Sequence, residues 1–296
     1  MHHPSAPRRL ALSLCTAALS LAATGLAHAT PVYANGVSGD LFTNAGPSNQ
    51  GQAVGSTGWY YNNTREAGSV GISTDYARDG NGSARLSGTQ GASKADIEYL
   101  ASGTGFGGNF FAAGTLGRFA DLQGMSYDWY RASGGSARAG LMPAMRVLLD
   151  LDGNLATTGD RGGLVFEQAY NGGGNAAVDT WVSQSIGAAS KLWNFGLGLG
   201  FEFDIDADGT PYDTLAEWQA SGRLSNAAIL GFSLGIGSGW GGSFDGAVDR
   251  VGWTIGNTSA SFNFEVTPTA TVPLPGTWAL AGIGLLALGS LRRRAG

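Results

Sequence analysis

Hydrophobic and polar residues alternate with a period of two in several short segments of the chain. In residues 125–131, Tyr127 and Trp129 alternate with polar positions, and residues 200–206 and 262–266 show the same pattern. Because successive side chains of a β-strand point to opposite faces, this alternation predicts strands that are buried on one side.

Further apolar segments of strand length are separated by clusters of Gly, Asn and Asp, which are typical turn residues. These segments are residues 69–74, 83–87, 95–100, 144–151, 164–170, 180–186, 229–237 and 248–255. One helix is predicted at residues 214–221, where Thr214 and Glu217 form a capping box and Gly222 can end the helix. Many strands and one short helix predict an all-β fold at residues 30–266, a two-sheet sandwich of the jelly-roll type.

The first 29 residues have the organisation of a secretory signal peptide. Two arginines precede an apolar run at residues 10–26, and Ala27 and Ala29 form the small-x-small pattern that signal peptidase recognises. We therefore expect signal peptidase to cleave the chain before Thr30, so that the rest of the protein is exported.

The C-terminus combines two prolines, an apolar segment and a cluster of arginines, in that order. Residues 276–291 are uncharged and would form a helix about 24 Å long, slightly shorter than the hydrocarbon core of a bilayer. The three arginines that follow favour the cytoplasmic side, which places the main domain outside. The pattern predicts a transmembrane helix, joined to the domain by a Thr/Pro linker at residues 267–272.

This C-terminus resembles the PEP-CTERM sorting signal of Gram-negative bacteria, whose tail is processed by an exosortase. The residues that carry the resemblance are Val272, Pro273, Pro275, Gly276, Arg292, Arg293 and Arg294. Leu274 stands where the motif has its glutamate. The resemblance of residues 273–296 implies transient anchoring in the inner membrane, then release into the cell envelope or the medium, in association with an exopolysaccharide layer.

The composition limits the chemistry of the exported part. All three histidines and the cysteine precede residue 30, which excludes Ser-His-Asp and Cys-His catalysis and metal sites built from His or Cys. Without the five terminal arginines, 12 basic and 22 acidic residues leave a net charge of −10. This charge argues against nucleic acid or an anionic membrane surface as a partner.

One aspartate-rich stretch resembles an EF-hand calcium loop. Asp204, Asp206 and Asp208 occupy its first, third and fifth positions, but Leu215 stands where the bidentate acid is expected. Asp213 is the acid that could replace it with a different geometry. The stretch is therefore a candidate for a structural Ca²⁺ at these four aspartates, while the missing acid favours the alternative of a strand end with a solvated acidic turn.

A second stretch, DLDGN at residues 150–154, has the same character. Asp150, Asp152 and Asn154 present oxygens at alternate positions. Because hard cations bind carboxylate and amide oxygens, this stretch is a shorter candidate for a calcium site.

Aromatic residues in turns are candidates for contacts with sugars, whose C–H faces stack on aromatic rings. Trp240 lies in the turn GSGWGGS, and Trp59 begins a cluster of three aromatic residues. The alternative is that these rings fill the ends of the sandwich. The glycine-rich region around Trp240 also resembles domains found ahead of this sorting tail, which are likened to carbohydrate-binding or lectin-type jelly rolls.

Two carboxylates leave an enzyme open as an alternative. Glu202 and Asp206 would share one face of the strand predicted at residues 200–206, as in the Glu-x-Asp pattern of laminarinase-type retaining glycosidases, although the final glutamate of that pattern is absent. Glu202 would be the nucleophile and Asp206 the acid. We expect a non-catalytic protein that is structural or binds extracellular polysaccharide, with a secreted polysaccharide hydrolase as the alternative.

Overall fold

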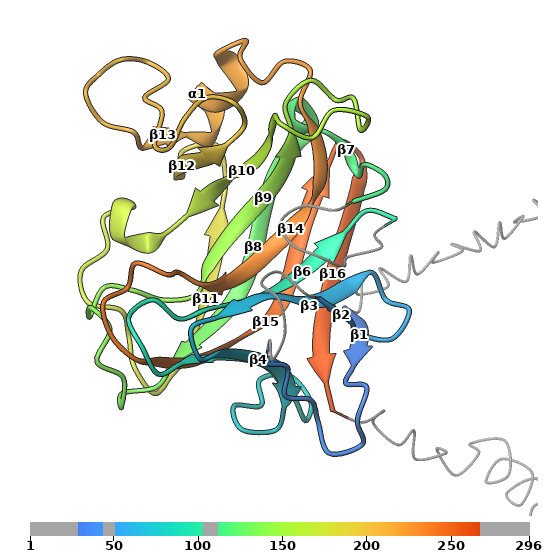
Figure 1. Cartoon of the computed structure of the whole chain (residues 1–296), viewed down its shortest axis with the longest axis vertical. Helices are drawn as coiled ribbons and strands as arrows, with labels where there is room; N and C mark the ends of the chain where they lie inside the picture. The colour runs from blue at the N-terminus through green and yellow to red at the C-terminus, as the bar shows by residue number, and fades with distance from the viewer. Residues whose placement is uncertain (1–28, 44–50, 103–111, 267–296) are drawn as a thin grey trace, which may run out of the picture.

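The computed structural model describes residues 29–43, 51–102 and 112–266. Within these residues the chain forms two β-sheets and one α-helix (Figure 1), which confirms the predicted all-β two-sheet sandwich. The predicted transmembrane helix at residues 276–291, the linker, the sorting residues and nearly all of the signal peptide lie outside the described residues. Within the described ranges, no helix is long and apolar enough to cross a membrane.

The larger sheet contains nine of the described strands, in the order β13-β12-β10-β9-β14-β6-β3-β2, with β7 also paired to β14. Neighbouring strands in this sheet are antiparallel. The strands are β2 (Gln52–Ala53), β3 (Trp59–Arg65), β6 (Lys94–Leu100), β7 (Gly117–Arg118), β9 (Ala144–Asp150), β10 (Arg161–Phe166), β12 (Lys191–Gly196), β13 (Asp213–Thr214) and β14 (Ala228–Ile236).

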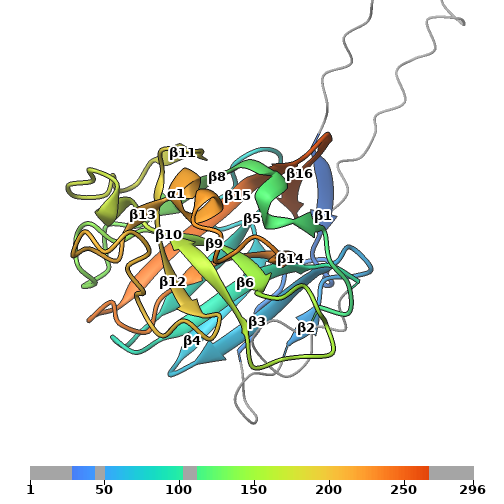
Figure 2. The same cartoon turned by 90° about the horizontal axis from the view of Figure 1, so that it is seen from above.

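The smaller sheet is built around the long strand β15, seen with its neighbours in Figure 2. Strand β8 pairs along one edge of β15, while β5 and β16 share the other edge. Strand β1 lies parallel to β16, β4 pairs with β5, and β11 pairs with β8. The strands are β1 (Thr30–Tyr33), β4 (Gly68–Ser73), β5 (Ser83–Gly88), β8 (Leu122–Arg131), β11 (Trp181–Ile186), β15 (Phe244–Ile255) and β16 (Thr258–Glu265).

The core between the sheets is rich in aromatic side chains. Trp59 and Phe232 from the larger sheet pack against Phe264 and Trp253 from the smaller one, and all four are buried. The Trp59 and Phe264 rings meet edge to face at 4.9 Å, and Phe232 stacks on Trp253 at 4.3 Å. Such contacts hold the two sheets together through large apolar surfaces with defined geometry.

The predicted helix is present, as α1 (Leu215–Ala220) with Thr214 as its N-cap. Two short 3₁₀ helices, η1 (Phe119–Asp121) and η2 (Gln168–Tyr170), also occur. The strand predicted at residues 164–170 ends at Phe166, because the chain turns there into η2.

The prediction of a strand at residues 200–206 is wrong. This segment is an irregular loop in which Gly200 and Glu202 have positive φ angles of 89° and 52°. The buried Asn194 side chain holds the loop: its Nδ2 donates to the Gly200 carbonyl at 2.8 Å, and its Oδ1 accepts from the Phe203 amide at 2.5 Å. These bonds to one side chain replace the pairing that a neighbouring strand would supply.

Candidate functional site

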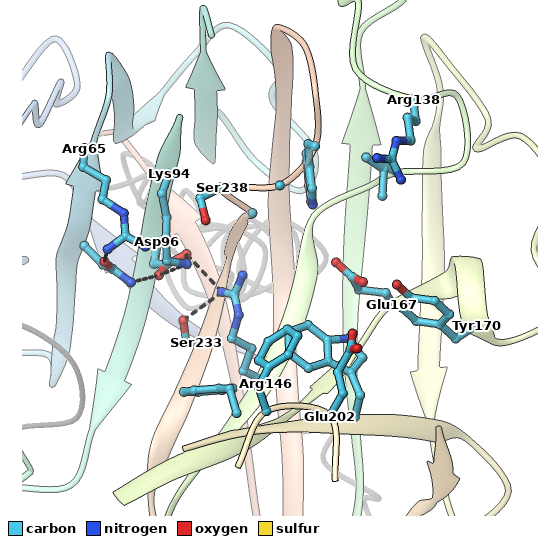
Figure 3. A pocket seen from close by; sticks show the side chains of 18 of the residues that line it. Arg65, Lys94, Asp96, Arg138, Arg146, Glu167, Tyr170, Glu202, Ser233 and Ser238 are labelled. Atoms are coloured by element: carbon cyan, nitrogen blue, oxygen red, sulfur yellow. Dashed lines mark hydrogen bonds and ion pairs between the residues drawn. The ribbon is translucent and has the colours of Figure 1, made fainter. Parts of the chain in front are cut away.

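A cavity of about 420 Å³ lies on the outer face of the larger sheet, turned away from the core (Figure 3). On β6, Ile97 is in the core, so Asp96 and Glu98 on either side of it face outward. Loops at residues 138–141, 167–170, 201–202 and 237–240 surround the cavity. Its lining consists of Asn63, Arg65, Lys94, Asp96, Glu98, Arg138, Leu141, Arg146, Glu167, Tyr170, Trp193, Phe195, Phe201, Glu202, Ser233, Gly237, Ser238, Gly239 and Trp240.

The register of the sheet places polar residues of the cavity floor side by side. Glu98 on β6 pairs with Ser233 on β14, and Ser233 pairs with Arg146 on β9. The row continues through Val165 on β10 to Trp193 on β12. One row across five adjacent strands therefore carries an acid, a hydroxyl, a guanidinium and an indole.

Asp96 is the centre of an ion network in the cavity. Its carboxylate lies 2.8 Å from Lys94 Nζ and 3.0 Å from Arg146 Nη1, and it accepts from Asn63 Nδ2 at 2.7 Å. Burial alone would raise the pKa of Asp96, but Arg146 and Lys94 outweigh it and hold that pKa below its usual value. Gly235 makes room for this network, because a Cβ there would lie 1.9 Å from Asp96 Oδ1.

Glu98 is the second buried acid of β6, with 1% of its surface exposed. It accepts a hydrogen bond from Asn62 Nδ2 at 2.7 Å. Burial, together with the nearby charge of Asp96, raises the pKa of Glu98 to about 7. Near neutral pH this carboxyl can therefore either donate or accept a hydrogen bond.

Glu167 and Glu202 lie across the cavity from Lys94 and Asp96, as Figure 3 shows. Glu167 follows β10 directly, and Glu202 comes from the irregular loop after β12. Burial raises the pKa of Glu167, although Arg146 opposes the effect, and the Glu202 carboxylate adds to it. The cavity thus places one carboxyl with a raised pKa near a second carboxyl.

Aromatic rings line the same side of the cavity. Trp193 meets Phe201 edge to face at 5.3 Å, and 68% of the Phe201 surface is exposed. Tyr170 stacks on Tyr212 at 3.9 Å. The rings of Trp193, Phe201 and Tyr170 offer an apolar surface beside the charged floor, and an exposed phenylalanine at the rim of a cavity is available to a ligand.

Trp240 and Trp59, the two candidates for sugar contacts, have different places in the fold. Trp240 lines the cavity, but only 5% of its surface is exposed because it packs on Phe244. Trp59 begins β3 and is fully buried in the core, which rules out sugar contact there and agrees with the alternative of a ring that fills the sandwich. Sequence reasoning missed Trp193, whose strand β12 was not predicted.

The proposed pair of catalytic carboxylates does not share a strand. Glu202 lines the cavity, whereas Asp206 is exposed and is not among its lining residues. The two carboxylates were expected on one face of a strand, but residues 200–206 form a loop. Asp96 and Glu98 were missed as site residues, although the alternation of KADIEYL around Ile97 was a signal that they face outward.

The predicted calcium ligands are only partly grouped. Carboxylate oxygens of Asp204, Asp206 and Asp213 lie within 4.8 Å of one another. Asp208 is outside this group and instead accepts from the Thr210 amide and hydroxyl, both at 2.8 Å. Calcium at this loop stays a prediction.

Residues 271–294 match the family model described as "PEP-CTERM protein-sorting motif", which confirms the predicted sorting signal. The match indicates an exported protein that is sorted by an exosortase to the envelope or the extracellular space. None of the curated proteins compared with the chain matches it.

Among solved structures, the chain is similar to "Crystal structure of Loop Swap mutant of Necallimastix patriciarum Xyn11A". The two chains are 9% identical with a TM-score of 0.31, over 73% of this chain and 99% of the other.

Proposed function

We propose that this exosortase-sorted protein binds extracellular polysaccharide through the cavity of the larger sheet, without cleaving it. The observation that carries the proposal is the combination, in one cavity, of aromatic rings with charged and polar groups fixed by the sheet. A sugar ring has apolar C–H faces and a rim of hydroxyl groups, so it needs both kinds of surface. The sorting signal sends the protein to the compartment in which such polymers lie.

The charges in the cavity suit a ligand rich in hydroxyl groups. Four basic residues and four acids line the cavity, so cations and anions are mixed over its floor and its surrounding loops. The basic residues are Arg65, Lys94, Arg138 and Arg146. Hydrogen bonds to charged groups are stronger than those between neutral groups. Because Lys94 and Arg146 are already held by Asp96, a ligand would meet groups in fixed positions.

The size of the cavity supports the same proposal. Its volume of about 420 Å³ lies within the range of roughly 300–1,000 Å³ that is typical of small-molecule sites. Trp193 and Phe201 form one wall, where a short segment of a polysaccharide could stack.

The proposal is tested by calorimetric titration of residues 30–266 with soluble β-glucans and with the exopolysaccharide of the producing bacterium. We expect Trp193→Ala to weaken binding by about tenfold or more, as loss of a central aromatic anchor does. Trp181→Ala is the matched control, because Trp181 is also partly exposed but lies on β11 of the smaller sheet. Equal affinities for wild type and Trp193→Ala, or binding by none of these polymers, would refute the proposal.

A polysaccharide hydrolase is the second candidate, favoured by the raised pKa of Glu167 near Glu202. A carboxyl with a raised pKa is suited to act as a general acid, and a second carboxylate can act as nucleophile or base. The hydrolase predicts release of reducing sugars that Glu167→Gln and Glu202→Gln each abolish while binding remains. The binding protein predicts no release by the wild type.

A further inference from the structure

The hairpin loop between β9 and β10 brings three carboxylates together. Oxygens of Asp150, Asp152 and Asp160 lie within 4.8 Å of one another. Asp150 ends β9 and pairs with Arg161, the first residue of β10. The Leu151 amide donates to the Asp160 carbonyl at 3.3 Å, so the sheet itself fixes Asp150 and Asp160 as neighbours.

Two carboxylate oxygens of this cluster are buried without a hydrogen-bond donor among the described residues. The Asp150 side chain is fully buried; its Oδ2 accepts from Arg161 Nε at 3.2 Å, but its Oδ1 accepts nothing. In Asp160, Oδ2 accepts from the Asp152 amide at 3.1 Å, and Oδ1 is buried and lacks a donor. Buried oxygens without partners are rare in folded proteins, and an ion or a water is the usual explanation.

The charge of the cluster is not balanced by its described neighbours. Arg161 is the cation that pairs with it, against three carboxylates. Crowded acids of this kind are stabilised when a cation lies between them.

We propose that this loop binds a calcium ion through Asp150, Asp152 and Asp160. The ligands are all oxygens, which hard cations prefer. Calcium accepts irregular loop geometry, whereas magnesium demands a near-ideal octahedron and keeps most of its water. Asp152 is exposed, so the ion can enter from solvent, and calcium sites of extracellular modules typically have a Kd of about 10⁻⁴–10⁻³ M.

The second aspartate cluster, Asp204, Asp206 and Asp213, differs from the β9–β10 cluster in its hydrogen bonds. Asp204 accepts from the amides of Ala207 and Gly209, and Asp213 accepts from the Ile205 amide. None of the oxygens in this cluster is among the buried, partnerless atoms of the described chain. Backbone amides therefore donate to three carboxylate oxygens of Asp204 and Asp213, whereas the buried Oδ1 of Asp150 has no donor among the described residues.

Thermal unfolding of the exported chain, from Thr30 onward and treated with EDTA, tests the proposal. We expect 5 mM Ca²⁺ to raise Tm by about 3–5 °C and Mg²⁺ to do clearly less. Asp152→Asn should remove most of the Ca²⁺ shift, because it removes one ligand charge from an exposed position and leaves the fold intact.

Asp206→Asn is the matched control. Asp152 and Asp206 are both exposed, and each accepts a hydrogen bond from the backbone amide two residues later. The donor to Asp152 is Asn154 at 2.7 Å, and the donor to Asp206 is Asp208 at 3.0 Å. We expect Asp206→Asn to keep the full Ca²⁺ shift. The proposal is overturned by the absence of a Ca²⁺ shift in the wild type, by an equal shift with Mg²⁺, or by an Asp152→Asn protein that responds like the wild type.

Discussion

At the scale of single residues, the surroundings of Asp249 in the smaller sheet disfavour a negative charge. It is fully buried on β15, where its Oδ1 accepts from the Phe264 amide at 2.8 Å. Its Oδ2 has no hydrogen-bond partner in the part of the chain that the structure describes. Burial raises the pKa of Asp249 to about 7.

This pKa predicts how Asp249→Asn changes stability with pH. The pKa of Asp249 in the folded state is above its unfolded value of about 3.9. Between these two values the folded protein therefore binds more protons than the unfolded chain. The wild type consequently loses stability as pH rises from about 4 to 7. Asp249→Asn cannot ionise, so its free energy of unfolding relative to the wild type should rise by roughly 2–4 kcal/mol across this window. Any constant cost of the buried amide cancels in the comparison.

Urea unfolding at pH 4.5 and 7.5 measures this difference. Asp121→Asn serves as the control, because Asp121 is exposed in η1. Parallel pH profiles for wild type and Asp249→Asn would contradict the account of this buried carboxyl.

At the scale of elements, the best-defined local signal was the start of α1. The Thr214 amide donates to Glu217 Oε2 at 2.7 Å, and the Glu217 amide donates to Thr214 Oγ1 at 3.2 Å, which is the capping box that the sequence predicts. Behind it, the buried Trp218 Nε1 donates to the Leu192 carbonyl at 3.0 Å and ties the helix to β12.

We therefore expect Thr214→Ala to lower the free energy of unfolding by about 1 kcal/mol, since an unsatisfied amide is left at the helix start. Chemical denaturation measures the loss, and Thr214→Ser, which keeps the hydroxyl, should restore most of it. Equal stability of the alanine and serine proteins would show that the cap contributes nothing.

Apolar segments between turn residues predicted most longer strands, and period-two alternation predicted parts of β8 and β16, in which one face is apolar. Alternation failed for β3, whose residues are buried on both faces up to Thr64, so that Trp59 and its neighbours show no alternation. It also failed at residues 200–206, where Asn194 captures a loop through hydrogen bonds that no sequence pattern shows.

The cavity could not be predicted for a related reason. Glu98, Arg146, Trp193 and Ser233 are far apart in sequence and meet only through cross-strand register. The Asp204 loop matched a calcium pattern more closely than DLDGN did, yet buried partnerless oxygens occur at Asp150, and burial cannot be read from spacing.

At the scale of the whole molecule, the two ends of the domain leave the smaller sheet. Thr30 starts β1, which runs parallel to β16 and pairs with it at Phe262. The cavity lies on the outer face of the other sheet. A domain held by its C-terminal end would therefore keep the cavity accessible to polymers, both before and after the tail is processed.

The most direct test of carbohydrate binding is a ¹H–¹⁵N spectrum of the tryptophan indole groups during titration with oligosaccharides from the producer's exopolysaccharide. The account predicts that the Trp193 and Trp240 signals shift and saturate together, while those of Trp59 and Trp218 in the core and Trp181 on β11 stay in place. Signals of Trp193 and Trp240 that do not move at saturating oligosaccharide, or a shift confined to Trp181, would contradict it.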